Sequence, residues 1–277
     1  MKVNKNVLLL VIIIALVLII AQYHSSEAAT YPPILLTVEA NSPTMVVPTL
    51  SSNELTQSQQ NADDVGKMIA AWKAPRTKTG LWVHTVDYQT SEEGNGVILP
   101  DGQPMPTSYT NDDWFYVNQD GLVVKNVGSS KDAQGKVFQQ AAYQNGVTIN
   151  FTFDMREEGH SPSFLKLDGG FADEVNDALK SGRPIKKSQE LINGKPGVAF
   201  SYTEKYEKPV VLGNQKVPVS SATTKGYFDA SGNFTGIEIT YLLANGKTSL
   251  YQRVEFVSID FFPQAPQEIL DILERVK

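Results

Sequence analysis

The chain contains no cysteine. This absence excludes disulfide bonds, thiolate metal sites and the lipid-modified cysteine of bacterial lipoproteins. A domain that folds outside the cytoplasm without disulfides needs a sizeable hydrophobic core, and a chain of 277 residues is long enough to bury one.

A surplus of positive charge is also missing. The chain has 24 Lys and Arg against 30 Asp and Glu, a net charge of −6. Nucleic-acid binding depends on a basic face that neutralises phosphates, so we expect no nucleic-acid partner.

Sequence motifs of catalysis and of metal or cofactor binding are lacking too. Only three histidines occur, and His84 and His160 stand far apart with no second ligand at helical or strand spacing. No nucleophile elbow and no phosphate-binding glycine loop is present. Acidic pairs such as Asp112–Asp113 are poor candidates for acid–base catalysis, because neighbours on a strand point to opposite faces. We interpret them as solvated turn and cap residues. We therefore predict a non-enzymatic protein with no catalytic residue, no metal site and no cofactor.

The N-terminus carries an export signal. Lys2 and Lys5 precede an unbroken apolar run over residues 7–21, and small residues at Ser26 and Ala28 fit a signal-peptidase site. Residues 1–29 are predicted to be a signal peptide, with an uncleaved membrane anchor as the alternative. Both readings place the remainder outside the cytoplasm, in the periplasm or the extracellular space.

The remainder divides into a linker and one domain. Residues 30–56 are rich in Pro, Ser and Thr and are predicted to be an extended linker. Residues 57–277 are predicted to form a single antiparallel β-rich domain with helices. Three amphipathic helices are expected, over residues 61–73, around 171–180 and from Pro266 onward.

Alternation of apolar and polar residues dominates the rest of the chain. Hairpin turns are predicted at Asn145–Gly146 and Asn193–Gly194, and a meander over Tyr227–Phe262. The apolar positions change parity at Phe256 and Val257, which predicts a β-bulge. Residues 207–224 are predicted to be a long loop.

This order of elements resembles the periplasmic lipoprotein-carrier superfamily. The likeness rests on the helix over residues 61–73 before Trp82–Tyr88, the Tyr227–Gly232 turn and the closing Arg253–Pro263 strand. In that superfamily a curled sheet holds acyl chains in a concavity lidded by helices. The resemblance therefore implies a mainly β fold, a curled antiparallel half-barrel sheet with short amphipathic helices packed on its concave face.

A curled sheet would enclose either an apolar hollow or a closed core. Its strands supply seven apolar candidates for ligand contact: Trp82, Val86, Phe151, Phe200, Tyr202, Ile239 and Tyr241. Burial of CH₂ groups needs no directional residue, so a lipid or another apolar small molecule is the expected ligand. The alternatives are a membrane-tethered sensor or interaction module with a membrane or envelope protein partner, and a hydrolase with an unrecognised site.

Overall fold

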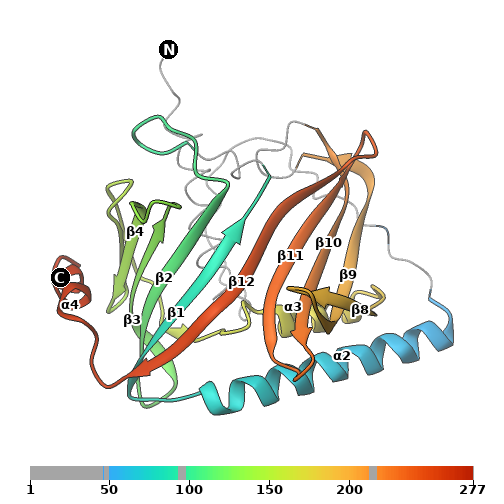
Figure 1. The fold of residues 1–277 in the computed structure, drawn as a ribbon, viewed down its shortest axis with the longest axis horizontal. Helices are drawn as coiled ribbons and strands as arrows, with labels where there is room; N and C mark the ends of the chain where they lie inside the picture. Colours follow the sequence, from blue (N-terminus) through green and yellow to red (C-terminus); the bar gives the residue numbers. More distant parts are fainter. Residues whose placement is uncertain (1–45, 47–49, 93–97, 212–216, 277) are drawn as a thin grey trace.

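The computed structural model describes residue 46 and residues 50–92, 98–211 and 217–276. The predicted signal segment and residues 30–45 and 47–49 of the predicted linker lie outside the described residues. The described chain is mostly β: one antiparallel sheet of twelve strands that curls without closing into a barrel (Figure 1). The prediction of a curled antiparallel half-barrel is confirmed.

The elements follow one another along the chain in a simple order. The helices are α2 (Ser52–Lys73), the 3₁₀ turn η1 (Ala74–Arg76), α3 (Phe171–Lys180) and α4 (Gln267–Glu274). The first strands are β1 (Leu81–Thr90), β2 (Ser108–Val117), β3 (Leu122–Lys131), β4 (Val137–Gln144), β5 (Val147–Asn150), β6 (Met155–Glu158) and β7 (Ser163–Phe164). The last strands are β8 (Lys186–Ile192), β9 (Lys195–Val210), β10 (Val219–Asp229), β11 (Phe234–Leu243) and β12 (Thr248–Phe262).

Two meanders join to make the sheet. Its spatial order is β6-β5-β4-β3-β2-β1-β12-β11-β10-β9-β8, and β7 pairs with β3 outside this path. The first strand therefore pairs with the last, with Trp82 opposite Phe262 and Thr90 opposite Arg253. We call this β1–β12 pairing the seam.

The seam contains the predicted bulge. Val86 pairs with Ser258 and Asp87 with Phe256, which leaves Val257 as the extra residue of β12. Its side chain is 64 % exposed. The change of parity along β12 is thus explained, and a bulge of this kind adds twist to the strand that carries it.

Two faces of the sheet are distinguished by the register. The inner face carries Val83 and Phe115, which lie directly opposite each other on β1 and β2, and the outer face carries Trp82 and Tyr116. Helices α2 and α3 pack against the inner face, where Ile69 and Phe171 join the main core. That core gathers the apolar residues of both helices with Val83, Phe115, Phe200, Phe228 and Phe234 of the strands.

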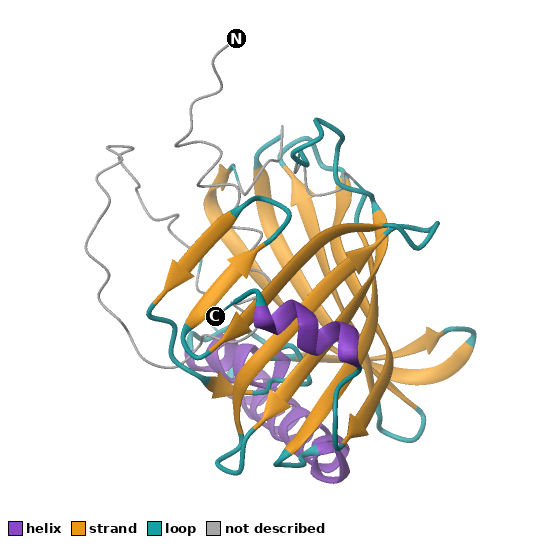
Figure 2. Ribbon diagram, turned by 90° about the vertical axis from the view of Figure 1, so that its left-hand side faces the viewer, coloured by secondary structure: helices purple, strands orange, loops and turns teal. Residues whose placement is uncertain are grey.

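Helix α4 packs on the outer face, opposite α2 and α3 (Figure 2). Ile269 and Leu273 contact a cluster that includes Trp82 and Trp114. The prediction that the helices pack on the concave face is therefore right for α2 and α3 and wrong for α4. No helix in the described part of the chain is long and apolar enough to span a membrane.

Some predicted boundaries differ from the structure. Helix α2 begins at Ser52, within the predicted linker, because Ser51 and Glu54 form a capping box. The predicted loop over residues 207–224 contains the end of β9 and the start of β10. The side chain of Asn150 ends β5, since its Oδ1 accepts the backbone N–H groups of Thr152 and Phe153 at 3.1 Å each.

Candidate functional site

The inner face changes character along β1 and β2. Near α2 and α3 the inner face is apolar and packed against these helices. Beyond Val83 on β1, and before Phe115 on β2, the inner side chains become polar. Opposing residues share a face, so the register gives the inner polar residues directly. We call six of them the inner polar strip: Asp87, Gln89, Tyr109, Asn111, Asp113 and Ser130.

Most of the inner polar strip is held by hydrogen bonds. Asn111 donates from Nδ2 to Oδ1 of Asp87 at 3.0 Å and accepts from Oγ of Ser130 at 2.8 Å. Gln89 accepts at Oε1 from the hydroxyl of Tyr109 at 2.7 Å and from Nε2 of Gln252 at 3.0 Å. These bonds fix the side chains of three neighbouring strands and reach across the seam to β12.

Asp113 differs from the other members of the strip. Its carboxyl forms no hydrogen bond or ion pair with any residue that the structure describes. Its carboxyl lies over Gly128 of β3, where a Cβ atom would overlap Oδ1. The surface area of Asp113 is only partly covered, but many protein atoms lie around its carboxyl. Both properties are expected of a group at the bottom of a concave face.

The two inner carboxyls are hard to ionise. Burial raises the pKa of Asp87 to about 6, against the opposing effect of hydrogen bonds from Asn111 and Gln89. Burial also raises the pKa of Asp113 well above its usual range, and the negative charges of Asp87 and Asp112 raise it further. The pKa of the Tyr109 hydroxyl is raised by burial and by the charge of Asp87.

An aromatic cluster lies beside the strip on the other side of the seam. The rings of Tyr241 and Tyr251 stack with centroids 4.7 Å apart, and Ile239 packs with them. Ile239 is the direct cross-strand partner of Gln252, which donates to Gln89 of the strip. An acidic polar zone and an apolar aromatic zone therefore adjoin on the inner face.

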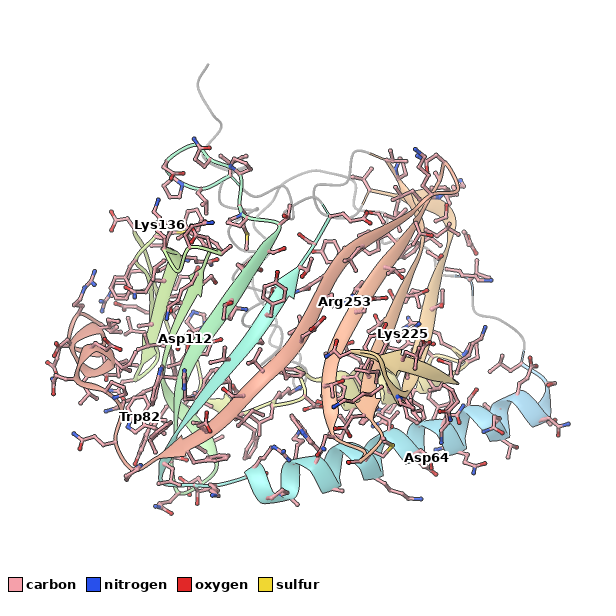
Figure 3. The ribbon with its side chains drawn as sticks, viewed as in Figure 1. Asp64, Trp82, Asp112, Lys136, Lys225 and Arg253 are labelled. Carbon is pink, nitrogen blue, oxygen red and sulfur yellow. The ribbon has the colours of Figure 1, made fainter. Side chains whose placement is uncertain are left out.

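The structure does not bring the seven predicted ligand contacts together. Trp82, labelled in Figure 3, belongs to the outer cluster around α4, as does Phe151. Val86 shares the outer face with Trp82. Phe200 is fully buried in the main core. Tyr202 lies in the same core and donates its hydroxyl to Glu174 of α3 at 2.8 Å. Ile239 and Tyr241 alone join the aromatic cluster beside the strip.

The outer face carries a separate group of charges. His84 stacks on Trp114 with ring centroids 4.3 Å apart, and its Nε2 lies 2.8 Å from Oδ1 of Asp112. The other oxygen of Asp112 accepts from Lys131 at 2.5 Å. Burial raises the pKa of Asp112, but hydrogen bonds from Lys131 and His84 outweigh it and leave the pKa lowered. His160 lies apart, 3.1 Å from Glu157, and the described residues contain no group of three metal-ligating side chains.

Sequence reasoning missed the carboxyls of the inner polar strip. The pair Asp112–Asp113 was expected in a turn, but β2 begins at Ser108 and places both residues in mid-strand. The expected opposition of neighbouring side chains does hold, with Asp112 outside and Asp113 inside. The detectable signal was polar residues at every second position from Tyr109 to Asp113, in a strand that continues into Phe115.

Comparison with solved structures finds a likeness of architecture. The lipoprotein LppX of Mycobacterium tuberculosis is 15 % identical, with a TM-score of 0.33, over 78 % of this chain and 99 % of that one. A β-barrel-like protein of a domain of unknown function, DUF1849, from Brucella abortus is 12 % identical, with a TM-score of 0.21, over 68 % and 100 % of the two chains. No family model and no curated protein matches the sequence. Function is therefore inferred from the residues of this chain.

Proposed function

We propose that the protein is a non-enzymatic, extracytoplasmic binding domain whose ligand is a lipid or another molecule with an apolar chain. The observation that carries the proposal is the division of the inner face. Helices α2 and α3 fill one end, while the inner polar strip and the aromatic cluster adjoin on the rest. Such a face matches an amphiphile, with its chain on one zone and its polar group on the other.

The apolar chain is assigned to the aromatic cluster. Ile239 and Tyr251 are partly buried and pack against the buried ring of Tyr241, and their apolar surface would extend along a bound chain. Each CH₂ group buried there would contribute ~0.8 kcal/mol. Export supports the same reading, because the N-terminal apolar run and Ser26/Ala28 predict that the domain acts outside the cytoplasm, where a membrane or envelope protein would exchange ligand with it.

Binding is tested with a matched pair of substitutions. A neutral fluorescent probe with an alkyl chain is titrated into wild type, Ile239→Trp and Val86→Trp. Both positions are half-buried strand residues, but Ile239 lies on the inner face and Val86 on the outer face. We expect saturable uptake by wild type and Val86→Trp and several-fold weaker uptake by Ile239→Trp. Absence of uptake, with no lipid in native mass spectra of the purified protein, would contradict the proposal.

A second candidate, a hydrolase, is favoured by one observation. Asp87 and Asp113 are neighbouring carboxyls whose pKa values are both raised by burial, as is common for catalytic acids. Both, however, project from adjacent strands of one wall, whereas glycoside hydrolysis needs carboxyls that flank the scissile bond. Turnover of glycoside or ester substrates, lost in Asp87→Asn, would establish this second function.

A further inference from the structure

We infer that the Asp113 side of the inner polar strip binds a cationic amine carried by the ligand, while an oxygen atom of the same ligand accepts a hydrogen bond from Nδ2 of Asn150. This inference rests on the proposed function and adds the chemistry of the ligand's polar group. The preferred ligand is then a basic amphiphile, in contrast to a fatty acid or a neutral lipid.

A missing positive charge is the first observation. Asp87 and Asp113 lie diagonally on β1 and β2, close enough for the charge of one to raise the pKa of the other. The carboxyl of Asp113 forms no hydrogen bond or ion pair with any described residue, and its direct cross-strand partner on β1 is the uncharged Thr85. Lys131 of the neighbouring strand β3 binds Asp112 on the outer face instead. Buried carboxyls are ordinarily paired, so a cation from outside the described protein would complete this site.

An unpaired donor on the same cross-strand row is the second, independent observation. The register runs from Asp113 through Gly128 and Ala141 to Asn150. Asn150 is 2 % exposed, and its amide Nδ2 has no hydrogen-bond partner. The residues between Asp113 and Asn150 in this row are Gly128 and Ala141, which are small and leave space above the sheet for a ligand.

Asp113 and Asn150 would bind different kinds of ligand atom. Asp113 can accept from an ammonium group, while Nδ2 of Asn150 can only donate and so requires an acceptor oxygen. Three strand spacings of about 4.8 Å separate the ends along the sheet, roughly 14 Å between backbones, and the side chains narrow that gap. An amino alcohol, an amino sugar or an aminoacyl ester has an amine and an oxygen within such a span.

Proton release follows from the same geometry. The charged groups that act on Asp113 are Asp87, on the same face of β1, and Asp112, its neighbour on β2 that points to the outer face; both are acidic and raise its pKa. Without a ligand, the raised pKa lets Asp113 keep its proton to higher pH than an ordinary carboxyl does, and an arriving ammonium ion favours release of that proton. A neutral ligand of equal chain length displaces none.

Octylamine, octanol and octanoate, which share one chain length, test the inference by isothermal titration calorimetry. We expect wild type to bind octylamine roughly 10- to 100-fold more tightly than octanol, as charge-assisted hydrogen bonds suggest. Octanoate should bind least. In buffers of different ionisation enthalpy, octylamine should release up to one proton at pH 7. Asp113→Asn should bind octylamine and octanol equally, while Asp112→Asn, the same change on the outer face, should keep the preference.

The outcomes separate the inference from the proposed function. Equal binding of octylamine and octanol by wild type would overturn the inference and leave the binding function standing. Binding of none of the three would overturn both. Saturable binding of Ca²⁺ that is lost in Asp113→Asn, without any preference for octylamine, would replace the amine site with a metal site and overturn the inference.

Discussion

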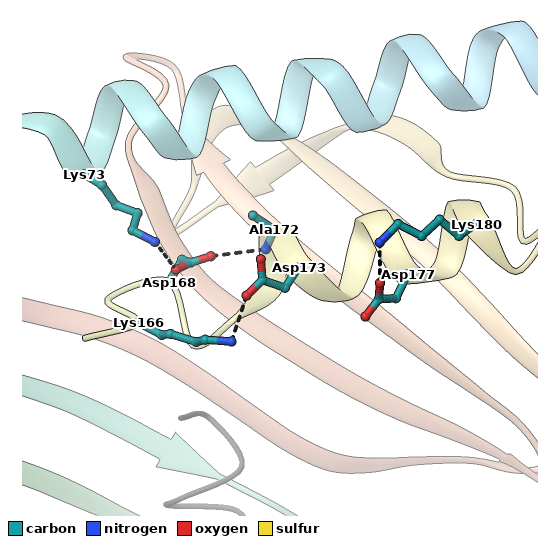
Figure 4. A network of polar contacts seen from close by, with 7 residues as sticks. All are labelled: Lys73, Lys166, Asp168, Ala172, Asp173, Asp177 and Lys180. Atoms are coloured by element: carbon teal, nitrogen blue, oxygen red, sulfur yellow. Dashed lines mark hydrogen bonds and ion pairs between the residues drawn. The ribbon is translucent and has the colours of Figure 1, made fainter. Parts of the chain in front are cut away.

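Lys73, in the last turn of α2, places its Nζ 2.9 Å from Oδ1 of Asp168, the residue that precedes α3 by a short turn (Figure 4). The side chain of Asp168 is only 3 % exposed. Its second oxygen accepts the backbone N–H of Ala172 at 3.1 Å, in the first turn of α3. One buried carboxylate thus ties the end of α2 to the start of α3 and holds both helices on the inner face.

We predict that Lys73→Met destabilises the protein strongly, because it leaves the buried charge of Asp168 unpaired. The free energy of unfolding should fall by roughly 3 kcal/mol. The control is Lys180→Met, which removes an exposed pair with Asp177 at 3.0 Å and should cost less than about 0.5 kcal/mol. Urea denaturation followed by circular dichroism measures both, and equal losses would contradict the prediction.

Gly226 of β10 gives a second prediction. A Cβ atom at this position would overlap the ring of Phe171, the first residue of α3. Gly226→Ala should therefore lower stability by roughly 1–3 kcal/mol through overpacking. The same change at Gly66, in mid-helix with open space around it, should raise stability by roughly 0.5–1 kcal/mol. Thermal unfolding that moves both variants in the same direction would refute this account.

Asp113 predicts a dependence of stability on pH. Its pKa is raised on folding, so the folded state keeps a proton that the unfolded state releases above its usual pKa near 3.8. The contribution of Asp113 to the free energy of unfolding is thus greatest at acid pH and falls as pH rises above about 4. Asp113→Asn removes the titrating group and with it the fall in the free energy of unfolding at higher pH. The variant should therefore be more stable than wild type at pH 7, and the two proteins should have nearly the same stability at pH 4.

Asp112→Asn is the matched control for pH dependence and should show the opposite sign. The pKa of Asp112 is lowered on folding, so its stabilising effect is present at neutral pH and disappears as pH falls through the folded value. The variant should be less stable than wild type at pH 7, with a difference that shrinks in acid. Urea midpoints at pH 4, 5.5 and 7 report both curves, and a common sign for the two variants would disprove the assignment of faces.

The outer helix provides a fourth prediction. Leu273 of α4 is buried against the cluster around Trp82 and Trp114. Leu273→Ala should cost roughly 2–5 kcal/mol, the range for a cavity in a packed core. Leu191 of the edge strand β8 is 75 % exposed, and Leu191→Ala should change stability by less than about 0.5 kcal/mol. A small effect at Leu273 would show that α4 adds little to the folded domain.

Local chemistry made much of the fold predictable. Asn145 and Asn193 have positive φ and are followed by glycines that do too, as the predicted two-residue hairpins require. The helices α3 and α4 were visible in their apolar spacing, and the parity change in β12 located the bulge at Val257. Each of these features depends on residues close together in the sequence.

The faces of the strands could not be predicted in the same way. Both faces of β1 carry large apolar side chains, since Val83 meets the main core while Trp82 meets α4. Alternation separates two faces but does not say which is concave when helices cover both. For that reason the predicted ligand contacts Trp82, Val86 and Phe151 were grouped with residues of the opposite face.

The start of α2 and the inner polar strip were missed for a related reason. The first turns of α2 are polar and show little apolar spacing, so only the capping pair Ser51/Glu54 marks where the helix begins. Asp87 and Asp113 lie apart in the sequence and become neighbours only when β1 pairs with β2. A site that depends on strand register carries no sequence motif.

The seam between β1 and β12 also has a kinetic consequence. Within each meander most pairings join strands that follow one another, so they close short loops and can form early. The seam joins Trp82 to Phe262 and needs both meanders to be in place before its register is set. The inner polar strip and the aromatic cluster belong to different meanders, and only the seam brings them side by side. The domain would therefore acquire its binding face at the last, slowest step of folding, when the two halves of the sheet meet.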